Sequence, residues 1–393
     1  MIVLSGMRPT GKLHIGHLVG VLENWKHLQD KYRCYFFIAD FHALTENPKN
    51  AFEIVQNTLE VVKDWISVGI DYKKSVIFVQ SKVMEHAQLH LILSMLVSLN
   101  RLFRNPTYKE KVEELARRGI ESKLVLNVDE NRIEESINST LDFIFKTIEI
   151  ENDKSKSREQ IYRKLKSDIM ELLRTTLDSS IIIEQFLPNA EISYGFLGYP
   201  VLQSADILIY RANFVPIGQD QIPHLELARE LARRFNSLYS EVFPIPEPIL
   251  TEFPKVLGID GRKMSKSYNN AIYISDSSNT VKEKIRKYFT DPNKIRKNDP
   301  GRPDICPIFY LHRVFNKEEK EEIYIDCSKG KLGCVDCKMK LFKKLDSYLE
   351  PIRQRREEVS SKEIFDILND GFIEAQKRAQ QTLELAYKAM KFQ

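Results

Sequence analysis

A strand, a tight turn and a helix at the start of the chain constrain its fold more than any other stretch. Ile2–Ser5 is a short apolar run that predicts a buried strand, and Gly6–Gly11 is a turn rich in glycine and proline. Apolar residues then recur at helical spacing over Leu18–Leu28, so the helix begins at His14-Ile15-Gly16-His17. The free N–H groups and the positive dipole end of such a helix favour phosphate binding.

The residue types in this first helical turn suit a nucleotide site. Gly16 lacks a Cβ and lets a ligand approach the backbone, while His14 and His17 lie three residues apart on one helix face. Two surface histidines on an ordinary helix would give the same tetrapeptide, so this motif alone leaves both interpretations open.

A cationic loop far downstream is a second candidate for phosphate binding. Gly261–Ser267 places Lys263 and Lys266 in a setting of serine and glycine. Such lysines can clamp a polyphosphate as its charge shifts during displacement, although a solvated basic loop would look similar. Together, the two stretches resemble the complete HIGH and KMSKS signatures of class I aminoacyl-tRNA synthetases. That resemblance implies activation of an amino acid with ATP and its transfer to tRNA.

Bulk properties set broad limits. The chain has 393 residues and 42% hydrophobic content, enough for two domains with their own cores. A net charge of +4 and a pI near 8.5 permit an RNA partner without arguing for one. No apolar run approaches the ~20 residues of a membrane span, and no secretory signal pattern opens the chain. We therefore expect a soluble, cytoplasmic protein with no membrane partner.

Strands alternating with helices predict an α/β fold with a Rossmann-like, doubly wound parallel sheet. Cys34–Ala39, Ser75–Gln80 and Phe214–Ile217 read as further strands, and a helix is expected over Ala51–Val68. The polar cluster Asp40–Thr45 follows the second strand, where open sheets of this kind place their ligands.

Composition divides the chain into three parts. We expect a catalytic domain formed by residues 1–111 and 194–275, a helical insertion over 112–193, and a C-terminal all-helical domain over 276–393. The last part is rich in lysine and arginine. It fits the domain that reads the tRNA anticodon in the resembled family, although solvated helix faces would have the same pattern.

A carboxylate on an otherwise apolar helix marks a second part of the site. Gln203 and Asp206 lie three residues apart on one face of this helix. A buried carboxylate is unfavourable unless it is paired, so we interpret Asp206 as an acceptor that waits for a donor on the ligand. A carboxylate that reaches solvent or caps a neighbour is the alternative. Gly218–Gln221 opens the next helix and suits the ribose and adenine of a nucleotide.

The order of these motifs resembles the bacterial-type tryptophanyl-tRNA synthetases over nearly the whole chain apart from the insertion. In that family, the residue matching Asp206 accepts the indole N–H of tryptophan. A site built around one hydrogen bond rejects analogues that lack it by ~10⁴–10⁵. Gln203 stands where several family members carry methionine. The resemblance implies further tryptophan-binding residues at Leu4, Gly6, His42, Gln203, Ile207, Val215 and Ile217.

The resemblance also implies a mechanism and partners. The tryptophan carboxylate attacks the α-phosphorus of ATP, Mg²⁺ neutralises the polyphosphate, and tRNA(Trp) receives the amino acid from the adenylate. His14, His17, Lys263 and Lys266 are the expected catalytic residues, with Lys109 assisting. A homodimer is implied by the family alone. The expected ATP-binding residues are Arg8, Pro9, Thr10, Gly16, His17, Gly218, Gln219, Asp220, Gln221, Val256, Lys263, Met264, Ser265, Lys266 and Ser267.

Two other functions remain open. A tyrosyl-tRNA synthetase shares the fold, but that family places a tyrosine in the first strand and an acidic residue before its HIGH motif. This chain has Leu4 and then Arg8–Gly11 at those places, which favours tryptophan. A non-catalytic, RNA-binding regulator is expected to have lost part of the two signatures, and this chain has kept both.

Four cysteines form the pattern C-x20-C-x6-C-x2-C at Cys306, Cys327, Cys334 and Cys337. In a cytosolic chain such a cluster indicates metal rather than disulfides. A [4Fe–4S] cluster and a structural Zn²⁺ each take four thiolates, and zinc ribbons usually have two C-x-x-C pairs, whereas one is present here. The arrangement looks like that of a subset of tryptophanyl-tRNA synthetases with a [4Fe–4S] cluster.

Overall fold

The computed structural model describes residues 1–46, 48–117, 192–250 and 256–392. The chain divides into two compact units, Met1–Asn105 with Gly195–Gln393, and Pro106–Tyr194. Of the second unit, the structure describes mainly the helix α7, Pro106–Arg117. Most of the insertion expected over 112–193 lies outside the described residues, so its helical character stays a prediction.

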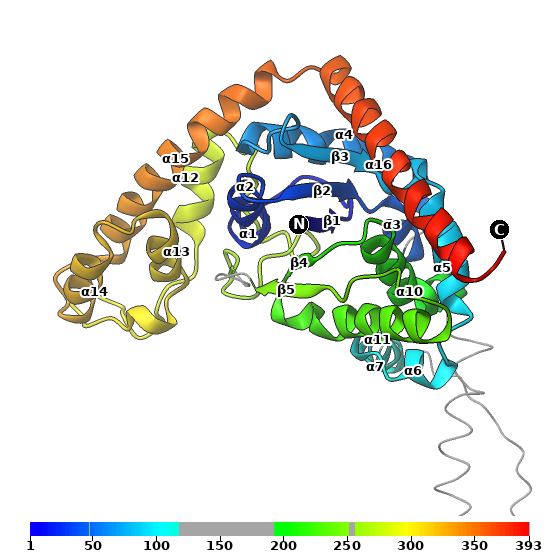
Figure 1. The fold of residues 1–393 in the computed structure, drawn as a ribbon. Helices are drawn as coiled ribbons and strands as arrows, with labels where there is room; N and C mark the ends of the chain where they lie inside the picture. Colours follow the sequence, from blue (N-terminus) through cyan, green and yellow to red (C-terminus); the bar gives the residue numbers. More distant parts are fainter. Residues whose placement is uncertain (47, 118–191, 251–255, 393) are drawn as a thin grey trace, which may run out of the picture. The chain divides into compact units, whose positions relative to one another are not determined.

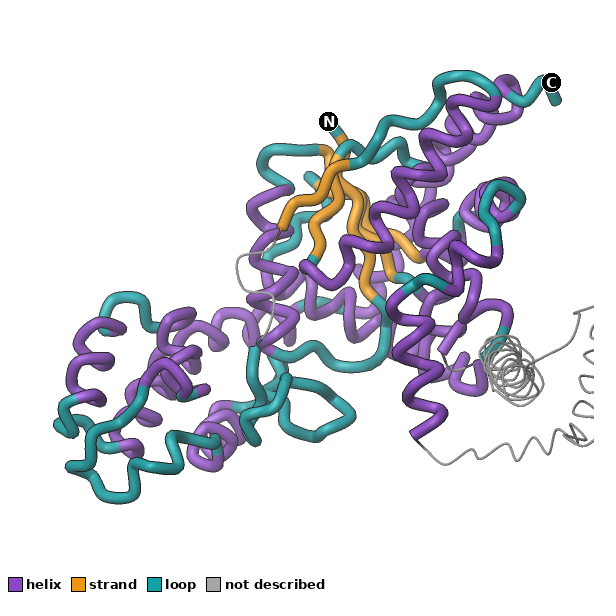
Figure 2. Tube along the Cα trace, turned by 90° about the horizontal axis from the view of Figure 1, so that it is seen from below, coloured by secondary structure: helices purple, strands orange, loops and turns teal. Residues whose placement is uncertain are grey.

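One parallel sheet forms the centre of the first unit. Its order is β3-β2-β1-β4-β5, and every strand pair is parallel. Helices lie on both faces of the sheet, as Figure 1 and Figure 2 show. The predicted doubly wound fold is therefore confirmed. The strands are β1 (Ile2–Met7), β2 (Arg33–Ile38), β3 (Ser75–Val79), β4 (Phe214–Ile217) and β5 (Glu247–Leu250).

Strands β1 to β4 of the sheet are buried on both faces because they are mainly apolar, whereas the edge strand β5 is mostly exposed. Neighbouring side chains alternate between two hydrophobic cores, so that Val3 and Cys34 face one core while Leu4 and Tyr35 face the other. β1 and β2 are in register from Ile2, which pairs with Arg33, to Met7, which pairs with Ile38. This register brings the ends of the two strands, and the loops that follow them, to the same edge.

Helices connect the strands in the order expected of crossover units. The segment after β1 is helical from Ile15 to Leu28, with a π-helical turn at Leu18–Leu22 between two α-helical parts. The helix expected over Ala51–Val68 has these bounds in the structure. The helices of this part are α1 (Ile15–His17), α2 (Glu23–Leu28), α3 (Asp40–Glu46), α4 (Ala51–Val68), α5 (Glu85–Ser94), α6 (Leu99–Phe103), α10 (Tyr194–Ile209) and α11 (Ile222–Leu238).

In the described residues from Ser278 onward, the regular structure is helical, which confirms the expected C-terminal helical region. It belongs to the same compact unit as the sheet. The last helix runs beside β3, and Gly371 lies so close to the carbonyl of Ile77 that a Cβ would overlap it. The helices are α12 (Ser278–Lys287), α13 (Pro307–Phe315), α14 (Lys320–Ser328), α15 (Cys334–Glu358) and α16 (Ser361–Ala389).

None of the helices in the described ranges has the length and apolarity needed to cross a lipid bilayer.

Candidate functional site

The candidate site lies at the carboxyl edge of the sheet, at the point where the strand order reverses between β1 and β4. β1 is flanked by β2 on one side and by β4 on the other. In open parallel sheets, ligands bind outside the carboxyl ends of the strands at such a switch point. The loops after β1 and β4 contain Arg8–Gly11 and Gly218–Gln221, so the sheet brings the two predicted nucleotide-binding loops to this edge.

Both histidines of the first helical turn have a defined hydrogen-bonding role. His14 is the N-cap of α1, where its Nδ1 accepts a hydrogen bond from Gly16 N at 3.1 Å. Nδ1 of His17 accepts from His14 N at 3.2 Å, and the two rings are 3.8 Å apart. Because each Nδ1 is an acceptor, each neutral ring carries its proton on Nε2. These Nε2–H groups are the donors that remain for a phosphate oxygen.

Burial keeps these histidines neutral. It lowers the pKa of His14 to about 4, with Lys266 and Lys263 contributing in the same direction. The pKa of His17 also lies well below its usual value, chiefly through burial. Neutral imidazoles in this position can donate hydrogen bonds to phosphates, and they add no positive charge that would repel the nearby lysines.

Lys266 connects the two phosphate-binding stretches. Its Nζ donates to the carbonyl of Gly11 at 2.8 Å and to Thr10 Oγ1 at 3.3 Å. Burial lowers the pKa of Lys266 to about 8. Lys263 is exposed, and Pro9 and Met264 are buried. The geometry therefore places the two signatures within reach of one polyphosphate.

Backbone pairing also holds the downstream stretch against the first helix. Ile15 N donates to Ile272 O and Ile274 N donates to Leu13 O, each at 2.9 Å. Val256 accepts from Met264 N at 2.9 Å, and its Cβ lies 3.6 Å from where a Cβ on Gly16 would stand. Gly16 and Val256 thus lie next to each other, which brings two of the residues expected to bind ATP together.

Asp206 is buried on α10 and accepts hydrogen bonds from three side chains. Its Oδ2 accepts from His42 Nε2 at 2.8 Å, and its Oδ1 accepts from Gln80 Nε2 at 2.7 Å and from His86 Nδ1 at 2.6 Å. Nε2 of His86 is then the acceptor for the hydroxyl of Tyr210 at 2.8 Å. The donors from His42 and His86 hold the pKa of Asp206 below its usual range despite its burial.

This network corrects one expectation. Asp206 is buried, as predicted, but it does not wait for a ligand to supply a donor. Gln80 and His86 were not identified from the sequence, because they lie far from Asp206 along the chain and meet it only in the fold. Tyr210 follows Asp206 closely in the sequence, but it joins the network through His86, so its role was not identified either. A buried carboxylate needs such donors. This requirement predicts that Asp206 has donors, but the sequence does not indicate which residues supply them.

Four apolar residues expected around the amino acid, Leu4, Ile207, Val215 and Ile217, belong to one hydrophobic core of the sheet. Gly6 faces the ring of Phe37, whose atoms leave no space for a Cβ at that position. Gln203 is half-buried on α10. Phe37 was not identified from the sequence, yet its ring lies 6.0 Å from that of His86. Leu4, His42, Ile207, Val215 and Ile217 are each less than a tenth exposed.

The loop after β4 has the expected position at the start of a helix. Gln219–Gln221 form a 3₁₀ turn before α11, and Gln219 and Asp220 are exposed. On α11, His224 pairs with Tyr199 OH and with Asn105 Nδ2, each at 3.2 Å. Burial lowers the pKa of this histidine to about 4.

Lys109 lies exposed on α7, in the second compact unit. Its expected assistance to the phosphate site stays a prediction.

The four cysteines line one small cavity of about 20 Å³. All four are free thiols, and Cys337 Sγ lies 3.4 Å from Nε2 of the buried His312. Within the described ranges, no three or more His, Cys, Asp or Glu side chains have the arrangement of a metal site. The chain thus brings the cysteines together, while the metal itself stays a prediction.

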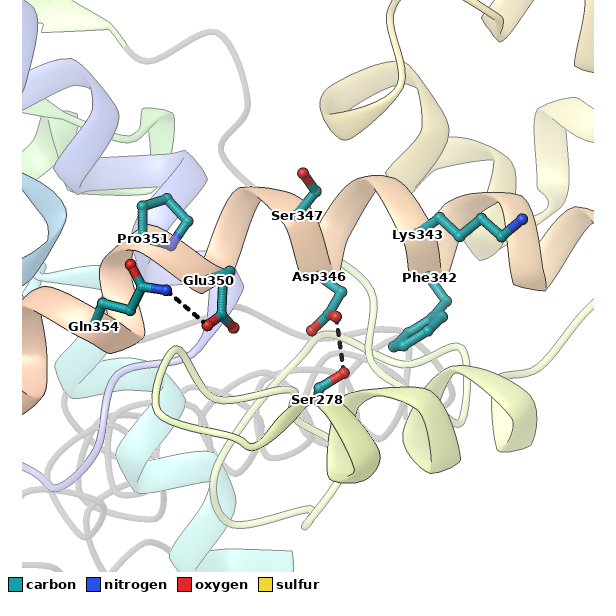
Figure 3. Close-up of a pocket in the computed structure, with 8 residues that line it drawn as sticks. All are labelled: Ser278, Phe342, Lys343, Asp346, Ser347, Glu350, Pro351 and Gln354. Atoms are coloured by element: carbon teal, nitrogen blue, oxygen red, sulfur yellow. Dashed lines mark hydrogen bonds between the residues drawn. The ribbon is translucent and has the colours of Figure 1, made fainter.

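A larger, open cleft of about 520 Å³ lies between α12 and α15. Figure 3 shows Asp346 and Glu350 on its α15 wall and Ser278 opposite. Asp346 accepts from Ser278 and Arg353, and Glu350 accepts from Gln354 and Arg353. Both carboxylates already accept hydrogen bonds from side chains of this chain, so the large cleft has few polar groups left to bind a ligand.

A family model described as tRNA synthetases class I (W and Y) matches residues 1–126 and 150–350. The chain is 46% identical to the tryptophan–tRNA ligase of Aquifex aeolicus, with 99% of each chain covered. It is 40% identical to the tryptophan–tRNA ligase of Thermotoga maritima, again with 99% of each covered.

Solved structures of tryptophanyl-tRNA synthetases are similar to this chain as well. The chain resembles tryptophanyl-tRNA synthetase from Campylobacter jejuni, solved with ADP and tryptophan, at 28% identity and a TM-score of 0.71 over all of both chains. A tyrosyl-tRNA synthetase from Archaeoglobus fulgidus, solved with L-tyrosine, shares the fold at 19% identity and a TM-score of 0.57, with 90% of each chain covered.

Proposed function

The chain belongs to the class I tryptophanyl-tRNA synthetases, and we propose that the site at the carboxyl edge of its sheet performs both steps of that reaction. As a tryptophan–tRNA ligase, EC 6.1.1.2, it activates L-tryptophan with ATP and transfers it to tRNA(Trp). The observation that carries the assignment of the site is the hydrogen bond from Lys266 to Gly11, because it joins the two phosphate-binding stretches.

Activation needs positioning and charge rather than a covalent intermediate. The tryptophan carboxylate attacks the α-phosphorus of ATP, which gives tryptophanyl-adenylate and pyrophosphate. The Nε2–H groups of His14 and His17 donate to the phosphate chain, and Lys263 and Lys266 follow the departing pyrophosphate. Mg²⁺ held by the phosphates supplies charge neutralisation, and Lys109 assists. The remaining ATP contacts are those expected at the loops after β1 and β4 and beside Val256.

Asp206 is proposed as the acceptor for the indole N–H. An ionised carboxylate offers about four acceptor positions, and the three donors from His42, Gln80 and His86 leave one of them. Those donors also fix the carboxylate in one orientation, so the remaining position is pre-arranged for a ligand. Phenylalanine has no matching donor, and its binding would leave this position empty. Leu4, Ile207, Val215 and Ile217 form the apolar walls beside Gly6.

We propose that Cys306, Cys327, Cys334 and Cys337 hold a [4Fe–4S] cluster, with Zn²⁺ as the alternative. Their lining of a single cavity supports a common ligand, and four thiols are the donor set of both groups. Bound there, the cluster would tie the loop before α13 to α14 and α15. Its chemistry plays no part in adenylate formation.

A homodimer is the proposed assembly. Met84, Leu91 and Met95, on α5 and directly beside it, and Leu99, at the start of α6, are each more than half exposed. Exposed apolar side chains so close in the sequence support an interface, and a second copy of this chain is the partner that the family implies. We place the enzyme in the cytoplasm, where its tRNA product is used for translation.

ATP–pyrophosphate exchange, measured separately with tryptophan and with tyrosine, tests this function. Exchange with tryptophan and none above background with tyrosine is the expected result. Exchange with tyrosine alone would identify a tyrosyl enzyme. No exchange with either would indicate a non-catalytic protein that kept the two signatures.

A further inference from the structure

An acidic side chain of α4 lies directly behind the phosphate-binding loop. Asp64 is fully buried, and its Oδ2 accepts a hydrogen bond from Leu13 N at 3.2 Å. Leu13 is the residue before the His14 N-cap, so Asp64 holds the backbone where the loop becomes a helix. Asn57, two turns earlier on α4, lies 3.8 Å from where a Cβ on Gly11 would stand. Asn57 and Asp64 of α4 thus lie beside Gly11 and Leu13 of the loop.

The other oxygen of Asp64 is held by the C-terminal helical region. Arg356 of α15 donates from Nε to Asp64 Oδ1 at 2.7 Å, and its second guanidinium nitrogen pairs with Glu60. Asp64 and Arg356 stand 292 positions apart and meet because α15 packs against α4. With one oxygen on Arg356 and one on Leu13, the carboxylate is fixed at both ends.

We propose that Asp64 is a positioning residue for ATP, which sets the loop Arg8–Leu13 for the phosphates and is itself held in place by Arg356 of α15. The inference rests on the proposed ATP site and adds two residues that touch neither ATP nor tryptophan. It also gives α15, whose first turn carries Cys334 and Cys337, a direct contact with the nucleotide-binding half of the protein.

The surrounding charges agree with this role. Burial raises the pKa of Asp64, and the guanidinium of Arg356 opposes that shift. The charge of Asp64 also counters the effect of burial on Lys266, which lies beside the same loop. Loss of the carboxylate would therefore affect the loop backbone and the lysine that bonds to it.

The alternative is that Asp64 and Arg356 only stabilise the fold. Single substitutions do not distinguish this structural role from the positioning role. Asp64→Leu alone leaves Arg356 without its buried partner, and the protein can fail to fold. Two matched double variants avoid this problem. Asp64→Leu with Arg356→Met removes the ion pair and the acceptor for Leu13. Asp64→Asn with Arg356→Met removes the ion pair but keeps an amide oxygen for Leu13.

The experiment measures KM for ATP and kcat in pyrophosphate exchange, the tryptophan Kd, and Tm for both double variants. A positioning role predicts that the Leu/Met variant raises KM for ATP about 10-fold, with an unchanged tryptophan Kd, while the Asn/Met variant stays within about 3-fold of the wild type. Arg353→Met, which removes two other ion pairs of α15, is the control and should change Tm alone.

Wild-type KM for ATP in the Leu/Met variant would overturn this inference, and so would equal increases in both double variants that follow Tm. Either result would leave the proposed function standing, because wild-type exchange is measured in the same series. Absence of exchange in the wild type would instead overturn the proposed function itself.

Discussion

The Nζ of Lys266 donates to the carbonyl of Gly11 at 2.8 Å, and the two residues are 255 positions apart in the chain. This bond closes the downstream lysine loop onto the turn after β1. The lysine is bonded to backbone at the place where phosphate oxygens are expected. When ATP binds, a phosphate oxygen therefore replaces the Gly11 carbonyl as the acceptor for Lys266. The charge of this lysine is already in position before the nucleotide binds.

Lys266→Ala should slow adenylate formation by ~10²-fold or more while tryptophan still binds, because this charge acts mainly in the transition state. Pyrophosphate exchange measures the rate, and equilibrium titration measures the tryptophan affinity. An unchanged exchange rate in this variant would refute the catalytic role of the lysine.

The same lysine predicts a pH dependence. Burial lowers the pKa of Lys266 to about 8 in the free enzyme, so the side chain loses its charge as pH rises through that value. The ratio kcat/KM for ATP reports groups of the free enzyme, and it should fall above pH 8. Lys266→Arg keeps its charge throughout this range and should remove the decline. A flat profile in the wild type would contradict this prediction.

Asp206→Ala should abolish selective tryptophan binding and also lower stability. The variant loses the indole acceptor, and it leaves the buried donors of His42, Gln80 and His86 without a partner. Each orphaned buried donor is unfavourable by about 1–3 kcal/mol. Isothermal titration at a temperature where circular dichroism still reports a folded protein checks the first effect. Wild-type tryptophan affinity under those conditions would exclude the proposed role.

Buried histidines should make the protein less stable in mild acid. Burial lowers the pKa of His14 and of His224 from 6.5 to about 4. The unfolded chain binds protons below pH 6.5, whereas the folded protein does so only near pH 4. Their contribution to stability is therefore complete above pH 6.5 and is lost as pH falls toward 4.

Urea unfolding at a series of pH values measures this effect. Between those two pKa values each ring should contribute a slope of about 1.4 kcal/mol per pH unit. His224→Gln should reduce the slope, and His27→Gln, at an exposed position, serves as the control. A His224→Gln protein with the wild-type slope would show that this ring is not the source.

The cysteine cavity predicts the metal content. Anaerobic purification should give a brown protein with iron and sulfide in equal amounts, and Cys334→Ser should lose both along with the visible absorption. Cys34→Ser, at a buried position outside the cavity, is the matched control and should keep the colour. A colourless wild-type protein that contains zinc would favour the alternative metal, and a metal-free one would exclude both.

Local pattern determined much of the fold. Apolar runs specified β1 to β4, because a strand buried on both faces needs nothing else to be recognised. Helical periodicity likewise specified α4. β5 escaped detection, since Glu247–Leu250 is a short edge strand that contains Pro248 and is mostly exposed. An edge strand with proline lacks the continuous apolar run by which the others were predicted.

The sequence by itself also determined the residue types of the site, because the two signatures carry the phosphate chemistry in short, contiguous stretches. Only the tertiary structure decided which residues complete that site. The partners of Asp206 come from α3, from the 3₁₀ turn after β3 and from α5, and the side-chain partner of Asp64 comes from α15. A buried carboxylate demands donors, but chain connectivity says nothing about which distant side chain packing will bring to it. Contacts over such separations exist only once the sheet and its helices have assembled.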